Sequence, residues 1–318
     1  MRSIGTVTLG FVAVTVLLPG LLVVGGLFDV ARVATGRRHF IAVRLILFGW
    51  VFLAAEVVGI LALGLVWLGT AGGRARRPFI AGTYAIQRRW AGTLFAVVRT
   101  LFGLQLEIDG DEVLTPGPIL VLMRHASIID NLLPSALITI PHGIKLRYVL
   151  KRELLSDPAL DIAGSRLPNY FVDRSVGGAA EVAAVGQLGM GLGPDEGVLI
   201  YPEGTRFTPE RRRRALRRIE DNPPLHARAS ALTEVLPPRP GGPLALLDVQ
   251  PPADVVIAAH SGLGGFSHIR NILSGGLVGS TIRVQFRRFP VPSIPTGEDE
   301  RIEWLYDRWA EIDAWIHE

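Results

Sequence analysis

The hydrophobic pattern divides the chain into an apolar front and an alternating remainder. Residues 5–30 carry no charge before Asp29, and residues 42–69 contain a single acid, Glu56. Each of these stretches is long enough to cross a bilayer as a helix. A carboxylate within such a segment has to face protein, a lipid headgroup or a bend in the chain. The pattern therefore predicts a two-helix membrane hairpin over residues 1–75.

The nature of the first helix and the topology of the hairpin leave alternatives open. Pro19-Gly20 predicts a kink in the first segment. A signal peptide is the alternative for this segment, although its apolar run exceeds a normal signal core and no cleavage site follows cleanly. Arginines flank the second segment on both sides: Arg32, Arg37, Arg38, Arg74, Arg76 and Arg77. The positive-inside rule thus gives no orientation, and a re-entrant pair in one leaflet explains the pattern as well as a spanning pair.

An amphipathic segment, residues 78–102, follows the hairpin. Its arginines, Arg88, Arg89 and Arg99, stand among aromatic and aliphatic residues. Such a helix lies on a membrane surface or packs its apolar side on a protein core, and the sequence favours neither alternative.

Short apolar runs and amphipathic segments alternate from residue 104 onward. Strands are predicted at 104–108, 119–123, 146–150, 169–172, 198–201, 255–259 and 282–286. Helices are predicted at 130–138, from 151 onward, at 178–189 and at 298–317. This alternation is typical of an α/β domain whose sheet is mostly parallel and flanked by helices. We therefore predict one such domain over residues 76–318, preceded by the two-helix membrane anchor.

Composition excludes several classes of function. The 318 residues include no cysteine, which removes disulfides, thiolate nucleophiles and cysteine-based metal sites. The net charge is +4 and the isoelectric point about 9.8, which suits a protein that meets anionic lipids or phosphorylated substrates. The sequence has no recognition-helix, zinc-finger or aromatic–basic platform pattern, so no nucleic-acid partner is predicted. The basic run at 211–218 indicates a solvated helix face or, as the alternative, a contact for anionic lipid.

A histidine and an aspartate follow the apolar run at 119–123 with four residues between them. His125 and Asp130 diverge on a straight helix or strand, so the backbone has to turn for their side chains to meet. A strand that hands over to a helix provides such a turn. A carboxylate that reaches an imidazole fixes its tautomer and raises its basicity, as in a general base. For this spacing alone, a purely structural pair is the alternative.

Three further segments combine apolar runs with charged, glycine or proline residues. Residues 202–206 (PEGTR) follow the predicted strand at 198–201, and open α/β sheets place ligands at the carboxyl ends of strands. Glycine permits close approach of the backbone, arginine matches phosphate oxygens, and glutamate orients the arginine or accepts from a hydroxyl. Residues 171–174 (FVDR) end a strand in a charge pair, for which a structural salt bridge is the alternative. Residues 235–237 (VLP) in isolation indicate only a loop.

In this order and spacing, the four segments resemble the 1-acylglycerol-3-phosphate O-acyltransferase (lysophosphatidate acyltransferase) family. The pattern of that family reads His-x4-Asp, an apolar pair with Asp-Arg, Pro-Glu-Gly-Thr-Arg, and an apolar-proline loop. Lys151 and the FRRFP segment at 286–290 are similar to the branch with the lysophosphatidate and lysocardiolipin acyltransferases. The resemblance covers about residues 90–318. It departs from the family pattern at Asn169 and at residues 240–242.

The resemblance implies direct transfer of a fatty acyl group from an acyl thioester to the free hydroxyl of lysophosphatidate, giving phosphatidate in phospholipid biosynthesis. His125, oriented by Asp130, would take the proton of the hydroxyl as its oxygen attacks the thioester. The lack of cysteine and of a G-x-S-x-G elbow agrees with a mechanism that has no acyl-enzyme. Six residues would hold the acceptor phosphate: Lys151, Arg174, Glu203, Gly204, Thr205 and Arg206.

The resemblance also implies partners and a location. The co-substrate would be acyl-coenzyme A or acyl carrier protein (acyl-CoA or acyl-ACP), with no cofactor and no metal, and the other partners would be membrane lipids and a lysophospholipid acceptor. Three other histidines, His142, His260 and His268, are scattered and are predicted to be structural. The protein is expected at the cell membrane, with its catalytic domain on the cytoplasmic face. The alternatives are another acceptor (lysocardiolipin or a glycolipid) and a non-catalytic lipid-binding protein on the same scaffold.

Overall fold

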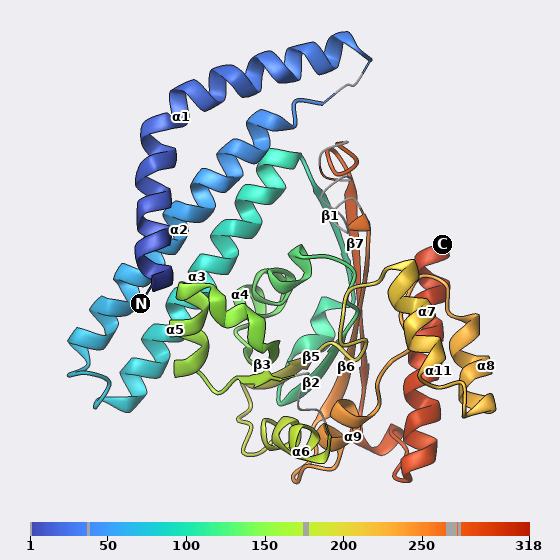
Figure 1. Ribbon diagram of the computed structural model, residues 1–318. Coiled ribbons are helices and arrows are strands. Elements are labelled where there is room, and N and C mark those ends of the chain that lie inside the picture. Colours follow the sequence, from blue (N-terminus) through green and yellow to red (C-terminus); the bar gives the residue numbers. More distant parts are fainter. Residues whose placement is uncertain (1, 37–38, 174–177, 265–271, 273–274) are drawn as a thin grey trace. The chain divides into compact units, whose positions relative to one another are not determined.

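The computed structural model describes residues 2–36, 39–173, 178–264, 272 and 275–318. The chain divides into two compact units (Figure 1). The first unit consists of Met1–Gln105, Arg152–Pro168 and His268–Thr281, and the second of Leu106–Lys151, Asn169–Ser267 and Ile282–Glu318. The division of the chain into an anchor over 1–75 and an enzyme domain over 76–318 stays a prediction.

Four long or medium helices build the first unit: α1 (Arg2–Ala34), α2 (Ala42–Gly69), α3 (Arg76–Phe102) and α5 (Pro158–Arg166). α1 packs against α2, and α2 packs against α3 and α5. Figure 1 shows a bend within α1, which contains Pro19, so the predicted kink is confirmed. α3 buries apolar residues such as Leu94 and Val98, as in the core-packing alternative for this segment.

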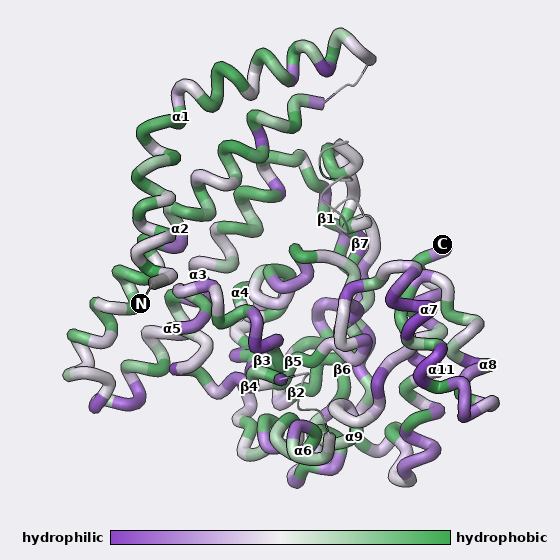
Figure 2. Tube along the Cα trace, viewed as in Figure 1, coloured by the Kyte–Doolittle hydropathy of each residue, from purple (hydrophilic) through white to green (hydrophobic). Residues whose placement is uncertain are grey.

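The first two helices are long and apolar enough to cross a membrane. Many of their aliphatic side chains are exposed, among them Val16 at 74% and Leu65 at 69%. Figure 2 shows hydrophobic residues along most of both helices. An apolar surface of this extent is unusual for a protein face in water, and it is the expected surface of a helix pair in lipid. The prediction of two apolar N-terminal helices that pack together is confirmed.

Two buried carboxylates link the helices of the first unit. Asp29, near the end of α1, accepts hydrogen bonds of 3.0 Å from each of the N–H groups of Ile41, Ala42 and Val43. It therefore caps the start of α2, where helical N–H groups have no partner within the helix. Glu56 in α2 accepts from Trp90 Nε1 at 2.9 Å and from the N–H of Ala159 at 3.3 Å. Glu56 therefore faces protein, which is one of the three surroundings predicted for it (protein, a lipid headgroup or a bend).

The second unit is built on a seven-stranded sheet in the order β1-β7-β6-β2-β5-β3-β4. The strands are β1 (Gln105–Asp109), β2 (Ile119–Met123), β3 (Lys145–Lys151), β4 (Tyr170–Val172), β5 (Glu196–Ile200), β6 (Asp254–Ser261) and β7 (Thr281–Phe289). β6, β2, β5, β3 and β4 pair in parallel, and β7 pairs antiparallel with β6. The α/β prediction with a mostly parallel sheet is confirmed.

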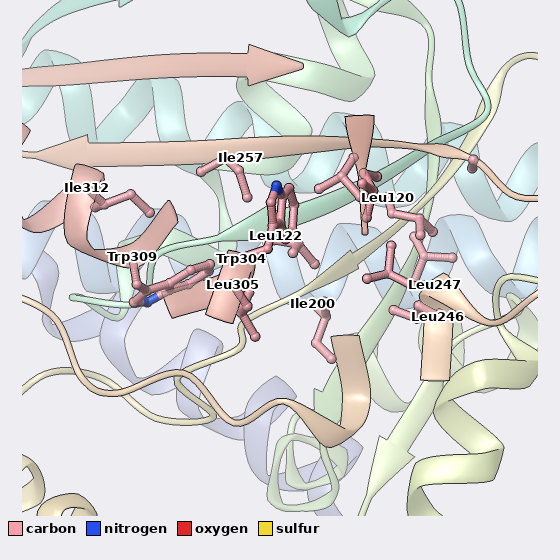
Figure 3. Packing of buried hydrophobic residues seen from close by; sticks show 14 of the residues in the cluster. Leu120, Leu122, Ile200, Leu246, Leu247, Ile257, Trp304, Leu305, Trp309 and Ile312 are labelled. Carbon is pink, nitrogen blue, oxygen red and sulfur yellow. The ribbon is translucent and has the colours of Figure 1, made fainter. Parts of the chain in front are cut away.

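The helices of the second unit lie between or after these strands. They are α4 (Ile140–His142), α6 (Ala179–Gln187), α7 (Pro209–Arg217), α8 (Pro223–Ala231), α9 (Gly241–Leu247) and α11 (Glu298–His317). α11 confirms the predicted closing helix. Figure 3 shows its residues Trp304, Trp309 and Ile312 beside Leu122 and Ile257 of the sheet, and all five are buried.

Two predicted helices are present but differ in type and bounds. The segment predicted at 130–138 consists of a 3-10 turn (Ile129–Asn131) and a helix that starts at residue 133, contains a π-helical stretch (Ser135–Thr139) and ends with α4. Lys151 ends β3 and is followed by a 3-10 helix (Arg152–Ser156), with α5 starting only at Pro158. The turn at 129–131 matters for the site, because it reverses the backbone directly after β2.

Candidate active site

Parallel pairing brings the charged ends of several strands to one edge of the sheet. His125 follows β2, Tyr201 follows β5, Lys151 ends β3, and His260 lies near the end of β6. β2 pairs with both β5 and β6, so the ends of these three strands are neighbours although they are far apart in sequence. The carboxyl edge of such a sheet is the usual place for a ligand site.

His125 and Asp130 meet as the sequence predicts. Their closest atoms, Nδ1 and Oδ2, are 3.1 Å apart. The same oxygen accepts from the N–H groups of Ala126 at 2.5 Å and Ser127 at 2.7 Å, so the turn wraps around the carboxylate. Asp130 is fully buried and His125 is 6% exposed. Burial opposes the charge on Asp130, but His260, His125 and the Ser127 N–H outweigh it and keep the pKa of Asp130 below 3.8.

The pair defines the tautomer of His125. A carboxylate only accepts hydrogen bonds, so Nδ1 carries the proton and Nε2 carries the lone pair. Nε2 has no hydrogen-bond partner among the residues that the structure describes. The Tyr201 ring lies 4.5 Å from the His125 ring, centre to centre, and the Tyr201 hydroxyl donates to the Asp130 carbonyl at 3.0 Å. The histidine is therefore held on one side and available as a base on the other.

The neutral form of His125 is favoured by its surroundings. Burial lowers the pKa of His125 below 6.5, the charges of Lys151 and Arg206 act in the same direction, and Asp130 opposes them. We expect kcat/KM to hold as the pH falls to 6.5 and to decline only below that value, since the base has to be unprotonated to act. A pH–rate profile of the free enzyme measures this acidic limb. An acidic limb centred above pH 6.5 would contradict a buried neutral base.

Glu203 connects three of the four sequence segments. One carboxylate oxygen accepts from the N–H of His125 at 2.8 Å and the other from the N–H of Leu236 at 3.0 Å. The side chain is 2% exposed, and burial raises its pKa to about 8. Both oxygens are engaged by backbone, so the geometry supports a role in holding the segments together. The contact of Glu203 with an acceptor phosphate stays a prediction that this arrangement does not favour.

The remainder of the PEGTR segment borders the histidine. Gly204 has a φ of +66°, a backbone conformation that favours glycine. Thr205 and Arg206 are partly buried. Arg206 has no carboxylate partner within the described part of the chain, and its charge acts on His125. A cation of this kind beside the base is suited to an anionic substrate group.

Lys151 and Arg174 are the other two predicted phosphate ligands. Lys151 ends β3, is partly exposed, and acts electrostatically on His125 as Arg206 does. Arg174 lies outside the described residues. The binding of phosphate by these residues stays a prediction.

Sequence reasoning missed Tyr201, Arg124 and His260 as parts of the site. Arg124 is 6% exposed and His260 is 0% exposed, so both are buried. Their signal was position alone, because each stands at or just after the carboxyl end of a strand, as the predicted site residues do. Within the described ranges, no group of three or more potential ligand side chains could hold a metal ion.

Comparisons with known proteins match the region that contains this site. Residues 105–242 match the family model described as acyltransferase. A 1-acyl-sn-glycerol-3-phosphate acyltransferase of Pseudomonas aeruginosa is 30% identical over 130 residues, which are 41% of this chain and 49% of the relative. The match therefore spans about half the length of this curated relative. The crystal structure of the 1-acyl-sn-glycerophosphate (LPA) acyltransferase PlsC from Thermotoga maritima is 14% identical, with a TM-score of 0.49 over 85% of this chain and 98% of that one.

Proposed function

We propose that the chain, whose residues 105–242 match the acyltransferase family model, transfers a fatty acyl group from an acyl thioester to the free hydroxyl of lysophosphatidate. The observation that carries the proposal is the buried His125–Asp130 pair, 3.1 Å apart, in which Nε2 has no partner among the described residues. The name of the Pseudomonas relative supports lysophosphatidate as acceptor and phosphatidate as product.

The proposed mechanism is a single displacement. His125 Nε2 takes the hydroxyl proton of the acceptor while the hydroxyl oxygen attacks the thioester carbonyl carbon. The carbon–sulfur bond then breaks, and the leaving thiolate receives the proton back from His125. Asp130 stabilises the imidazolium that exists between these two transfers. The chain has no cysteine, so no thiol of its own takes over the acyl group.

The acceptor phosphate is proposed to lie against the PEGTR loop and the end of β3. Arg206 and Lys151 provide positive charge close to His125, and Gly204 and Thr205 provide backbone and hydroxyl donors in the same loop. Arg174 completes the proposed set.

Replacing Arg206 by alanine is expected to raise the KM for lysophosphatidate by about 10- to 100-fold, with a smaller effect on kcat. A charge-assisted hydrogen bond contributes about 1.5–3 kcal/mol, and its loss affects ground-state and transition-state binding alike. Steady-state kinetics with varied acceptor concentration measure the change. Arg213→Ala is the matched control, because Arg213 is exposed and forms its ion pair with Glu210, the preceding turn's acid, at 3.7 Å. An unchanged acceptor KM in the Arg206 variant would exclude the phosphate role.

The proposed location is the cell membrane, with the catalytic domain on the cytoplasmic face. The exposed apolar surfaces of α1 and α2 support membrane attachment. Acyl-CoA or acyl-ACP is the proposed donor, and membrane lipids and the lysophospholipid acceptor are the other partners.

The proposal is tested with purified, detergent-solubilised protein, lysophosphatidate and an acyl-coenzyme A, by following release of the free thiol. Thiol release that requires both the acceptor and His125 is the expected result. Release without acceptor would indicate a thioesterase instead. A panel of lysophospholipid and glycolipid acceptors, with acyl-ACP as second donor, then determines specificity.

A further inference from the structure

His260 faces the side of Asp130 that His125 does not use. Asp130 Oδ2 accepts from His125 and from two backbone N–H groups. Asp130 Oδ1 has no hydrogen-bond partner among the described residues and lies 3.6 Å from His260 Nε2. His260 and Asp130 are both 0% exposed. A buried carboxylate oxygen is costly without a donor, and His260 Nε2 lies on this side of the carboxylate, at 3.6 Å.

The tautomer of His260 follows from a second contact. Its Nε2 lies 3.1 Å from the carbonyl oxygen of Arg124. A carbonyl only accepts, so Nε2 carries the proton and directs it to the region between the Arg124 carbonyl and Asp130 Oδ1. The other ring nitrogen, Nδ1, is buried without a partner. The geometry therefore corresponds to a neutral ring with its single N–H on Nε2.

The side chain of Arg124 in turn binds the backbone of His260. Its guanidinium donates to the carbonyl of His260 at 2.5 Å and to the carbonyl of Glu234 at 2.9 Å. The two residues thus bind each other side chain to backbone in both directions, across the paired strands β2 and β6. This crosswise pair lies directly before His125, and it fixes the backbone from which the catalytic histidine projects.

Burial is the main cause that lowers the pKa of His260 and favours its neutral form. The charges of Arg124 and His125 also lower this pKa, whereas the charge of Asp130 and the hydrogen bond to the Arg124 carbonyl raise it. A neutral His260 presents its Nε2–H dipole to Asp130 Oδ1 at 3.6 Å without neutralising the carboxylate, so the negative charge of Asp130 stays available to His125.

We propose that His260 is a positioning residue for acyl transfer: its Nε2–H, which donates to the Arg124 carbonyl, also faces Asp130 Oδ1 at 3.6 Å, and this electrostatic contact keeps Asp130 Oδ2 directed at His125. This inference rests on the proposed function of the site. His260 touches no reacting atom in this arrangement. It acts through Asp130 during the interval in which His125 holds the proton of the acceptor hydroxyl.

The test compares two substitutions of His260. His260→Leu removes the donor and keeps a buried apolar side chain, and His260→Gln places an amide N–H near the position of Nε2. We expect the leucine variant to lose about 10-fold in kcat with an unchanged acceptor KM, and the glutamine variant to recover most of the rate. This loss in kcat is smaller than the about 10²–10⁴-fold loss expected when a general base is removed, because His125 itself remains. His142→Leu is the control, since His142 pairs with Asp111 at 3.3 Å away from the dyad.

A pH titration separates positioning from a general packing role. Weaker orientation of Asp130 removes stabilisation of the His125 imidazolium, so the pKa of His125 in the leucine variant should fall below the wild-type value and return with glutamine. NMR titration of the His125 ring measures this without turnover, and NMR of His260 in the wild-type chain reports its tautomer. A His260 ring protonated on Nδ1, or a His125 pKa equal in the wild-type and leucine proteins, would overturn the inference. Absence of thiol release by the wild-type protein would refute the proposed function alone, because the NMR results stand apart from activity.

Discussion

His125→Ala is expected to lower kcat by about 10²–10⁴-fold while the protein still folds and stays in the membrane. The alanine removes the ring that takes the hydroxyl proton, whereas the other imidazole beside Asp130, His260, is fully buried. The His125 side chain makes one hydrogen bond, to Asp130, and its backbone N–H keeps its bond to Glu203 in the variant. The expected loss is therefore in the rate and far less in the fold. Thiol release with saturating acyl-coenzyme A and lysophosphatidate measures it.

His226→Ala provides the control for this experiment, because His226 lies on α8 and its ring forms a hydrogen bond of 3.5 Å with the Ser230 hydroxyl. Full activity is expected in that variant. Thermal unfolding and membrane recovery of both proteins show whether folding is preserved. Wild-type rates in a folded His125→Ala protein would mean that another group is the base, and the proposed mechanism would fall.

Asp130→Asn is expected to have the second large effect, a loss of up to about 10⁴-fold in kcat with most of the fold retained. The amide oxygen can still accept the three hydrogen bonds that Oδ2 accepts from His125, Ala126 and Ser127. The charge that stabilises the imidazolium is lost, so the pKa of His125 should fall further and the acidic limb of kcat/KM should move to lower pH. The pH–rate profile of the variant measures both changes.

A stability cost accompanies Asp130→Asn. With the oxygen in the Oδ2 position, the amide NH2 replaces Oδ1 and faces the Nε2–H of His260, so two donors oppose each other. Opposed buried donors cost about 1–3 kcal/mol in the free energy of unfolding. Asp111→Asn is the control, because Asp111 is half exposed and makes its ion pair with His142. Unchanged kcat in the Asp130 variant would show that the carboxylate is structural, the alternative for this pair that its spacing alone leaves open.

The sequence by itself determined the elements and the chemistry that local pattern encodes. The uninterrupted apolar run at 119–123 is the central strand β2, all of whose residues are buried, because a strand covered on both faces needs apolar side chains at every position. The two long apolar helices and the closing helix α11 followed from length and periodicity in the same way. The His125–Asp130 contact was also local, since only five positions separate the two residues and one turn joins them.

Only the tertiary structure decided what surrounds that contact. The order of strands places β6 and β5 on either side of β2, and this brings His260 and Glu203 to the dyad from far along the chain. No local periodicity encodes such pairings, so the sequence did not indicate that Glu203 accepts hydrogen bonds from the N–H groups of His125 and Leu236. For the same reason, nothing in the sequence indicated that His260 lies beside Asp130. Burial and strand pairing, which depend on the whole chain, give it a place behind Asp130.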